Sequence, residues 1–178
     1  MLYVSNYLSP LGHLLILSDK NSIRGVGFEG QKFFAENFQQ EEIIEKSDLD
    51  IQKFARRWFD AYFLAKNPSL DELSLAPQGS DFQRTVWQIL TEIPYGEILT
   101  YGEIAGKVAI NLNKEKMSSQ AVGNAIAHNP VLIMIPCHRV IGANGNLTGF
   151  SAGISNKVKL LELEGHKIRP YNQKYFLI

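Results

Sequence analysis

The chain has 178 residues, of which 45% are hydrophobic and 20% charged, and this composition is typical of a globular protein and argues against a disordered one. No apolar run approaches the roughly 20 residues of a membrane-spanning helix, and the N-terminus lacks the basic segment and cleavage site of a signal peptide. The single cysteine, Cys137, excludes an internal disulfide framework and a zinc site built from several cysteines. We therefore expect a cytoplasmic protein whose thiol stays reduced.

The 18 basic and 18 acidic side chains cancel in total, but they are unevenly distributed. Residues 1–79 carry 8 basic and 11 acidic side chains, whereas residues 80–178 carry 10 basic and 7 acidic ones. The excess of positive charge in the second part permits contact with phosphates, but it does not by itself predict a nucleic-acid partner.

The first 30 residues predict three short antiparallel strands in meander order. Apolar and aromatic residues cluster over 3–7, 14–17 and 23–28, and turn-forming residues separate these clusters. The acidic and polar segment 41–50 that follows is typical of an exposed linker. The chain is therefore expected to begin with a small sheet.

A helix over 51–65 is predicted by apolar and aromatic residues that recur at helical spacing. Asp50 directly precedes this segment and is placed to cap its N-terminus. Such a helix would cover one face of the sheet. Residues 68–80, which contain Pro77 and Gly79, predict a linker to a second, mostly helical part.

Three further helices are marked by capping residues. Ser80 is placed to cap a helix that ends before Pro94, and Thr100 with Glu103 has the spacing of a capping box for a helix that ends near residue 108. Ser118 or Ser119 begins the third, which ends before Pro130. The last two helices suit a helix-turn-helix, but many helical pairs in enzymes share this spacing, which is weak evidence alone.

The residues around Cys137 complete the second part. The apolar run 131–135 predicts a buried strand that leads to the cysteine, and Asn144-Gly145 predicts a tight turn and thus a small hairpin after it. A last helix is expected from about residue 154 to 164, with Gly165 as its stop.

Cys137 itself allows two interpretations. A lone cysteine is most often a small buried apolar residue. However, His138 and Arg139 adjoin it, and an imidazole or a cation nearby favours the reactive thiolate. Glu164 ends a helix that returns to this region and is placed to orient the imidazole, as in catalytic triads. The structural alternatives are a partly exposed loop histidine for His138 and a solvated helix end for Glu164.

The segment Ile135-Pro136-Cys137-His138-Arg139-Val140 closely resembles the active-site signature of the O6-alkylguanine-DNA alkyltransferases, also called methylated-DNA–protein-cysteine methyltransferases. The resemblance is strong over residues 82–165, whereas the first 75 residues match only in their meander pattern. Several linked motifs in the same order are far more specific than one short motif. These further segments are Phe82-Gln83-Arg84-Thr85-Val86-Trp87, Ile93-Pro94-Tyr95-Gly96, Ala121-Val122-Gly123-Asn124-Ala125, Asn129-Pro130, Gly149-Phe150-Ser151-Ala152-Gly153, Lys157 and Leu163-Glu164-Gly165.

The resemblance implies an α+β fold with two domains. Residues 1–76 would form an N-terminal ribonuclease-H-like domain, a β-meander plus a helix. Residues 80–166 would form a C-terminal, mostly helical domain with a winged helix-turn-helix, which binds DNA and carries the active site. Residues 167–178 would remain as a tail, whose aromatic residues we expect to pack on the N-terminal domain.

The resemblance also implies the chemistry. The family binds duplex DNA in the minor groove and flips the damaged guanine into a pocket, because stacking hides the O6 substituent. The thiolate of Cys137 would attack the alkyl carbon and keep the alkyl group, so the protein acts once and needs neither cofactor nor metal. His138 would deprotonate Cys137 through a water, Glu164 would hold the imidazole, and Tyr101 would serve the leaving guanine at N3.

Further residues are implied to bind the substrate or the DNA. Ser151 would contact O6, and the carbonyls of Cys137 and Val140 would read the exocyclic amine, with Phe150 in the same substrate-binding set. Asn129 would brace the helix-turn-helix against the active-site loop. For Tyr101 and Asn129 the structural alternatives are a packed aromatic residue and an ordinary helix cap. The DNA-binding set consists of Ser119, Gln120, Ala121, Gly123 and Arg139.

Two departures from the family pattern bear on DNA affinity. Gln120 stands where the family often has an arginine that fills the gap left by the flipped base, so we predict weaker binding to DNA. The polar loop 111–116 looks longer than in many relatives. Its Lys114 and Lys116 are candidate phosphate contacts, and a merely solvated loop is the equally supported alternative.

The sequence therefore predicts a monomer that repairs alkylated double-stranded DNA by stoichiometric, irreversible transfer of the alkyl group from O6-alkylguanine to Cys137, with O4-alkylthymine as a further candidate substrate. A non-catalytic protein that only binds the lesion is the first alternative, but such relatives lack the cysteine. A cysteine hydrolase built on Cys137, His138 and Glu164 is the second. The adjacency of Cys137 and His138 and the lack of an evident oxyanion loop disfavour it.

Overall fold

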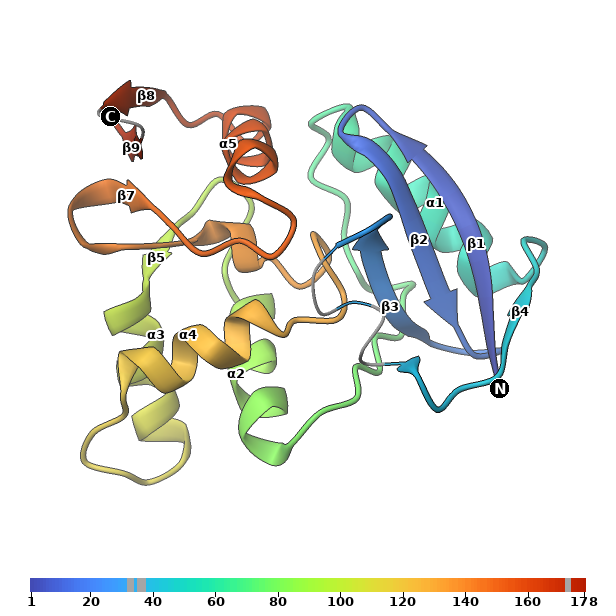
Figure 1. The fold of residues 1–178 in the computed structure, drawn as a ribbon, viewed down its shortest axis with the longest axis horizontal. Helices are drawn as coiled ribbons and strands as arrows, with labels where there is room; N and C mark the ends of the chain where they lie inside the picture. Colours follow the sequence, from blue (N-terminus) through green and yellow to red (C-terminus); the bar gives the residue numbers. More distant parts are fainter. Residues whose placement is uncertain (32–33, 35–37, 172–173) are drawn as a thin grey trace. The chain divides into compact units, whose positions relative to one another are not determined.

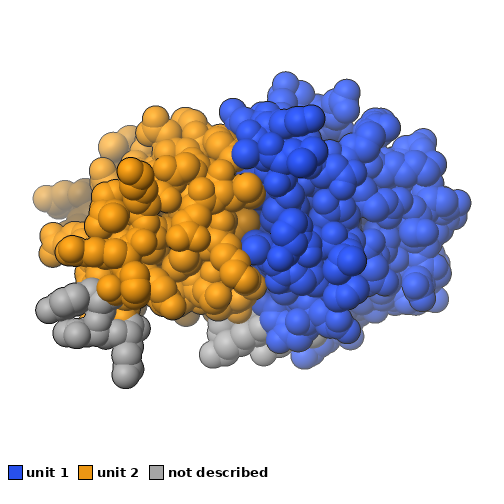
Figure 2. Space-filling model, turned by 90° about the horizontal axis from the view of Figure 1, so that it is seen from above, with its two compact units in different colours: residues 1–78, 130–134 blue, residues 79–129, 135–178 orange. Residues whose placement is uncertain are grey.

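The computed structural model of the chain describes residues 1–31, 34, 38–171 and 174–178. The chain divides into two compact units, which Figure 2 colours separately. Unit 1 consists of residues 1–78 and 130–134, and unit 2 consists of residues 79–129 and 135–178.

Unit 1 is built on a four-stranded sheet with the strand order β3-β2-β1-β4 (Figure 1). The first three strands are antiparallel neighbours, which confirms the predicted meander. The fourth, β4, runs parallel to β1 and lies within the segment that was predicted to be a linker, so that prediction is wrong at its centre. The strands are β1 (Leu2–Ser9), β2 (Gly12–Ser18), β3 (Ile23–Phe28) and β4 (Ile43–Glu45).

Helix α1 (Asp50–Phe63) lies along one face of this sheet, as the sequence predicts (Figure 1). Its buried side is aromatic and apolar, including Phe59 and Tyr62, and Phe59 packs against the ring of Tyr7 from β1. Asp50 does not cap the helix: Leu49 is the N-cap and makes no side-chain cap hydrogen bond. Asp50 is instead the first helical residue, where its negative charge interacts favourably with the helix dipole.

The apolar segment 130–134 belongs to unit 1. It is buried, as predicted, but it forms no extended strand: residues 131, 132 and 135 form isolated bridges, among them a parallel bridge between Val26 and Val131. Ile133 has a φ of 71°, which no regular strand accommodates, so the chain turns here. This turn leads directly to Pro136 and Cys137.

Unit 2 contains three helices that pack on one another and whose N-caps agree with the sequence predictions. Ser80 and Gln83 form a capping box at α2, Thr100 and Glu103 form one at α3, and the Ser118 hydroxyl caps α4. The helices are α2 (Asp81–Thr91), α3 (Tyr101–Asn111) and α4 (Ser119–Ala127).

The rest of unit 2 consists of short strands, 3₁₀ turns and one helix. The hairpin predicted after Cys137 is wrong: β6 pairs in parallel with β5, whereas β7 joins a three-stranded sheet of order β7-β9-β8. The elements are β5 (Leu99–Thr100), 3₁₀ turns at Cys137–Arg139 and Ala143–Gly145, β6 (Val140–Ile141), β7 (Asn146–Leu147), α5 (Ile154–Leu163), β8 (Ile168–Tyr171) and β9 (Lys174–Leu177).

The C-terminal residues are part of unit 2. Strand β9 pairs with β7, and Tyr175 packs against the buried cluster of Ile141, Leu147 and Leu161. The expectation that the aromatic residues of the tail pack on the N-terminal domain is therefore wrong for Tyr175. The pairing of β9 with β7 could not be predicted from local sequence, because β7 precedes β9 by more than 20 residues.

Candidate active site

Cys137 begins a 3₁₀ turn that follows Pro136, and its side chain is only 2% exposed. The buried amide of Asn129, just after α4, donates one hydrogen bond to the Cys137 Sγ at 3.1 Å and another to the Ile135 carbonyl at 2.8 Å. Both amide hydrogens are thus used, and they tie the end of α4 to the thiol. The structure brings Asn129 and Cys137 together as the sequence predicts.

Burial raises the pKa of the Cys137 thiol to about 11, although the hydrogen bond from Asn129 and the positive charge of Lys157 act in the opposite direction. Cys137 is therefore a neutral thiol at neutral pH, and it needs a base before it can act as a nucleophile. The expectation that the charges of His138 and Arg139 stabilise the thiolate is not met, because both side chains are directed to Glu164.

His138 and Glu164 form a buried pair. The His138 Nε2 lies 2.8 Å from the Glu164 Oε1, and both side chains are fully buried. Hydrogen bonds and charges from His138 and Arg139 lower the pKa of Glu164 despite the opposing effect of burial, so it is ionised and can only accept. Burial lowers the pKa of His138, so the imidazole is neutral with its proton on Nε2 and its lone pair on Nδ1.

Arg139 also lies inside unit 2, with 8% of its surface exposed. Its Nε and Nη2 donate to the two carboxylate oxygens of Glu164, each at 2.9 Å, and its Nη1 donates to the Ile93 carbonyl at 2.6 Å. A guanidinium held in this way cannot reach a phosphate, and this placement argues against the predicted DNA contact.

Lys157 on α5 is a buried cation whose role the sequence analysis missed. Its side chain is 0% exposed, and its Nζ donates to the Val140 carbonyl at 2.5 Å and the Thr148 carbonyl at 2.7 Å. Burial lowers its pKa to about 8. The helical spacing could have indicated that Lys157 is buried. Lys157 and Glu164 each lie three or four residues from the buried Leu160 and Leu161, so all four share the inner face of the helix.

Tyr101, the first residue of α3, directs its hydroxyl towards the loop after β7. The hydroxyl donates to the carbonyls of Thr148 and Gly149, each at 3.2 Å, and burial raises its pKa to about 12. Tyr101 therefore keeps its proton and acts as a donor. Gly149 has a φ of 62°, and a Cβ there would come within 2.7 Å of the Tyr101 oxygen, so this approach requires glycine.

The remaining predicted residues fall into two groups. Val140 and Phe150 are buried and Ser151 is half-buried, and the Val140 carbonyl accepts the hydrogen bond from Lys157. The predicted DNA-binding residues of α4 form a separate, outward-facing group, in which the first three are exposed and the last half-buried: Ser119, Gln120, Ala121 and Gly123. Gly123 lies beside the Tyr101 ring, since a Cβ there would be 3.7 Å from it.

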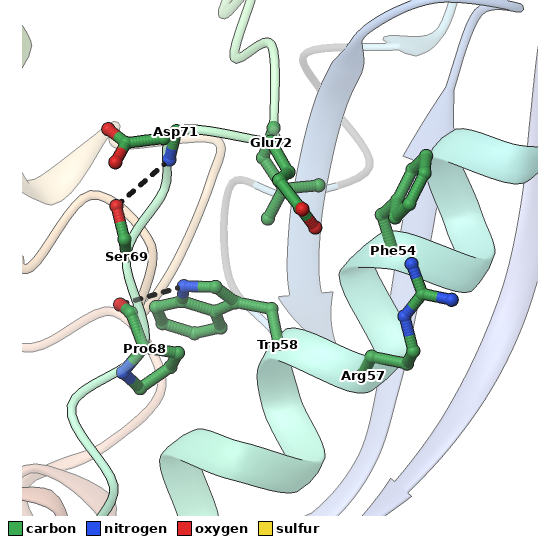
Figure 3. A pocket seen from close by; sticks show the side chains of 8 residues that line it. Phe54, Arg57, Trp58, Pro68, Ser69, Asp71 and Glu72 are labelled. Atoms are coloured by element: carbon green, nitrogen blue, oxygen red, sulfur yellow. Dashed lines mark hydrogen bonds between the residues drawn. The ribbon is translucent and has the colours of Figure 1, made fainter.

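Unit 1 has a hollow of its own, of about 420 Å³, between α1 and the segment 68–73 (Figure 3). The indole of Trp58 donates to the Pro68 carbonyl at 3.2 Å. The Arg57 guanidinium lies over the Phe54 ring, and both side chains are drawn in Figure 3. None of the predicted site residues lines it. The lining residues are Phe54, Arg57, Trp58, Pro68, Ser69, Asp71, Glu72 and Leu73.

The described residues show neither a metal site nor a membrane-spanning helix. Within residues 1–31, 34, 38–171 and 174–178, no group of three or more His, Cys, Asp or Glu side chains is arranged to hold a metal ion. In the same part of the chain, every helix is too short or too polar to cross a membrane.

Two family descriptions match the chain. The "6-O-methylguanine DNA methyltransferase, ribonuclease-like domain" matches residues 2–77, and the "6-O-methylguanine DNA methyltransferase, DNA binding domain" matches residues 81–166. Together with the solved structures described below, these matches confirm the predicted α+β fold class.

Two relatives named methylated-DNA–protein-cysteine methyltransferase are similar along most of the chain. The protein from Methanosarcina acetivorans is 42% identical over 167 residues, which cover 92% of this chain and 99% of that protein. The protein from Haemophilus influenzae is 40% identical over 163 residues, which cover 92% of this chain and 86% of that protein.

Solved structures show the same similarity. Mycobacterium tuberculosis OGT, crystallised in complex with DNA, is 34% identical with a TM-score of 0.79, and the match covers 91% of this chain and 92% of that one. The O6-methylguanine DNA methyltransferase from Methanococcus jannaschii is 28% identical with a TM-score of 0.63, covering 94% of this chain and 97% of that one.

Proposed function

The chain belongs to the 6-O-methylguanine DNA methyltransferase family, and we propose on this basis that Cys137 is the residue that receives the alkyl group. The protein is a DNA-binding repair enzyme that reverses alkylation directly, with the activity of a methylated-DNA–protein-cysteine methyltransferase. One observation carries the assignment of the residue: the lone cysteine is buried beside a neutral histidine that is paired with an ionised glutamate.

The first step is the activation of the thiol. His138 has its lone pair on Nδ1 and takes the proton of Cys137 through one water, while Glu164 stabilises the imidazolium that forms. The Asn129 amide and the Lys157 charge stabilise the thiolate at the same moment, because both lower the pKa of Cys137. Burial destabilises the Cys137 thiolate, and the neighbouring Asn129 and Lys157 partly offset this effect.

The second step is the displacement. The Cys137 sulfur forms a bond to the alkyl carbon while the bond between that carbon and the guanine O6 breaks, and the electron pair of the broken bond stays on the guanine. The Tyr101 hydroxyl donates to guanine N3 and offsets this charge, a role that suits a tyrosine that keeps its proton. The imidazolium proton finally passes to the guanine through water, which restores the normal base.

The carbon–sulfur bond that forms is not hydrolysed under these conditions, so each molecule acts once. This stoichiometric outcome separates the protein from a cysteine hydrolase. The presence of Cys137 separates it from a protein that only binds the lesion, and the comparisons do not favour that alternative either.

The substrate is O6-alkylguanine in double-stranded DNA, with O4-alkylthymine as a further candidate, and the protein works as a monomer in the cytoplasm. The exposed first turn of α4, with Ser119, Gln120 and Ala121, enters the minor groove. Ser151 and the Val140 carbonyl read the flipped base. Asn129 couples the two regions, because it follows α4 in sequence and is hydrogen-bonded to the thiol.

The test is to count repaired bases per protein molecule. The protein is incubated with excess duplex oligonucleotide that carries a single O6-methylguanine, and nucleoside chromatography measures the guanine restored. We expect one guanine per protein and no further increase with time. Continued turnover, or no restoration at all, would contradict the proposal.

A further inference from the structure

The carboxylate of Glu164 is saturated with hydrogen-bond donors. Its Oε1 accepts from His138 Nε2 at 2.8 Å and from Arg139 Nη2 at 2.9 Å. Its Oε2 accepts from Arg139 Nε at 2.9 Å and from the Gly96 amide at 3.2 Å. A carboxylate offers about four lone-pair positions, so this one has no freedom left to rotate. Two of these hydrogen bonds come from Arg139.

Arg139 is itself fixed at three points. Besides the two bonds to Glu164, its Nη1 donates to the Ile93 carbonyl at 2.6 Å, and its guanidinium lies 5.7 Å from the centre of the Tyr95 ring. The Tyr95 hydroxyl in turn donates to the Leu163 carbonyl at 3.1 Å, one residue before Glu164. Arg139 therefore connects the turn of Cys137 to the segment after α2 and to the end of α5.

The charge of Arg139 also matters for His138. An ionised carboxylate beside an imidazole favours the imidazolium, and a cation on the same carboxylate cancels much of that effect. The other titratable groups nearby come from four parts of the chain. Cys137 and Arg139 lie in the same turn as His138. Lys157 lies within α5, and Glu164 lies at its end. Tyr95 lies beside Arg139, and Tyr101 of α3 lies near Cys137.

We propose that Arg139 is a positioning residue for alkyl transfer, which clamps Glu164 so that His138 keeps its proton on Nε2 and presents an uncharged imidazole to Cys137. The inference rests on the proposed role of His138 as the base. It assigns Arg139 two separable contributions, one from the fork geometry of the guanidinium and one from its positive charge.

The test is the pH profile of the single-turnover rate of methyl transfer, measured with protein in excess over an O6-methylguanine duplex. In R139Q the charge is lost, so the acidic limb of the profile moves to higher pH. A shift of about one pH unit lowers the rate about tenfold at pH values below the midpoint of the limb. At pH values above the shifted midpoint the rate is much less affected. In R139K the charge stays but the fork is lost, so the rate falls at every pH while the limb stays in place. A limb that does not move in folded R139Q would overturn the inference.

R139Q leaves the buried Glu164 without its main partner and risks unfolding. Nitrogen-15 NMR of the histidine side chains in the wild-type protein and in R139K provides the second measurement. At neutral pH we expect His138 to be uncharged and protonated on Nε2 in both. A charged His138, or one protonated on Nδ1, in the wild type would overturn the inference. An unchanged rate in H138Q would instead show that His138 is not the base, which separates a failure of the proposed function from a failure of the Arg139 inference.

Discussion

At the scale of single residues, burial and reactivity compete most directly at Cys137. A pKa of about 11 lies about four pH units above neutrality, so forming the thiolate at pH 7 costs roughly 5 kcal/mol. This pKa already includes the stabilisation of the thiolate by Asn129 and Lys157, and His138 is proposed to accept the proton. The reaction at neutral pH therefore depends on these neighbours acting together with the thiol.

The hydrogen bond from Asn129 is the contact that most directly favours the thiolate. Asn129→Ala removes it and also leaves the buried Ile135 carbonyl without this donor. A hydrogen bond to a charged group contributes about 1.5 to 3 kcal/mol, so we expect the single-turnover rate to fall about 10- to 100-fold. Asn124→Ala, an exposed site on α4, is the control. A rate in the Asn129 variant within about twofold of wild type would contradict this role.

Gln120 is exposed on the first turn of α4, where it is proposed to fill the gap left by the flipped base. Gln120→Arg adds reach and a positive charge at this point. We expect tighter binding to duplex DNA in fluorescence anisotropy titrations at fixed salt. Gln78→Arg adds the same charge at an exposed position in unit 1 and reports the general effect of charge. Equal affinities for the Gln120 variant and the wild type would refute the assignment.

The chemistry-bearing residues could be identified from the sequence, but their electrostatic roles could not. Cys137, His138 and Glu164 are recognisable from linked motifs, and the structure pairs the side chains of His138 and Glu164. Arg139 looks like a surface cation in sequence, and only the fold shows that both of its donor edges are occupied inside unit 2. Charge in a sequence does not reveal burial, and burial decides whether a cation meets DNA or a carboxylate.

At the scale of elements, the predictions succeeded where the signal is local. A capping box is complete within four residues, and those at Ser80 and Thr100 are formed as predicted. The strand expected over 131–135 and the hairpin after Cys137 failed because strand pairing depends on distant partners. Hydrophobicity alone shows that such a segment is buried, but not what it pairs with.

The connection between α3 and α4 runs over residues 112–118, which is longer than the three or four residues of a typical helix-turn-helix. Lys114 and Lys116 are exposed there, and we expect both to contact phosphates. Replacing both with alanine should reduce the slope of log affinity against log salt concentration by about 0.9 for each lost contact. Lys159→Ala on the exposed side of α5 is the control. An unchanged slope would show that the loop is only solvated.

At the scale of the whole molecule, the active site affects stability as well as reactivity, because His138 and Glu164 are fully buried. Burial lowers the pKa of His138, so below about pH 6.5 this imidazole is protonated in the unfolded chain but stays neutral in the folded one. The pKa of Glu164 is also lowered, so the unfolded chain takes up a further proton below about pH 4.5. Since the unfolded state binds more protons in both ranges, stability falls as the pH falls.

Urea denaturation at a series of pH values checks this linkage. We expect the free energy of unfolding to decrease from about pH 6.5 downwards and to decrease more steeply below about pH 4.5. Glu164→Gln removes the carboxylate and should flatten the lower part of the curve. A wild-type curve that is level between pH 7 and pH 4 would mean that neither group stays unprotonated in the folded protein.

The central claim is that Cys137 itself takes up the alkyl group, and mass spectrometry of the protein tests it most directly. The protein is mixed with a duplex oligonucleotide that carries O6-methylguanine, and intact and peptide masses are measured. We predict one added methyl group on the peptide that contains Cys137, which saturates at one equivalent and is absent in Cys137→Ser. Binding of the oligonucleotide without any change in mass, or a methyl group on another residue, would contradict the claim.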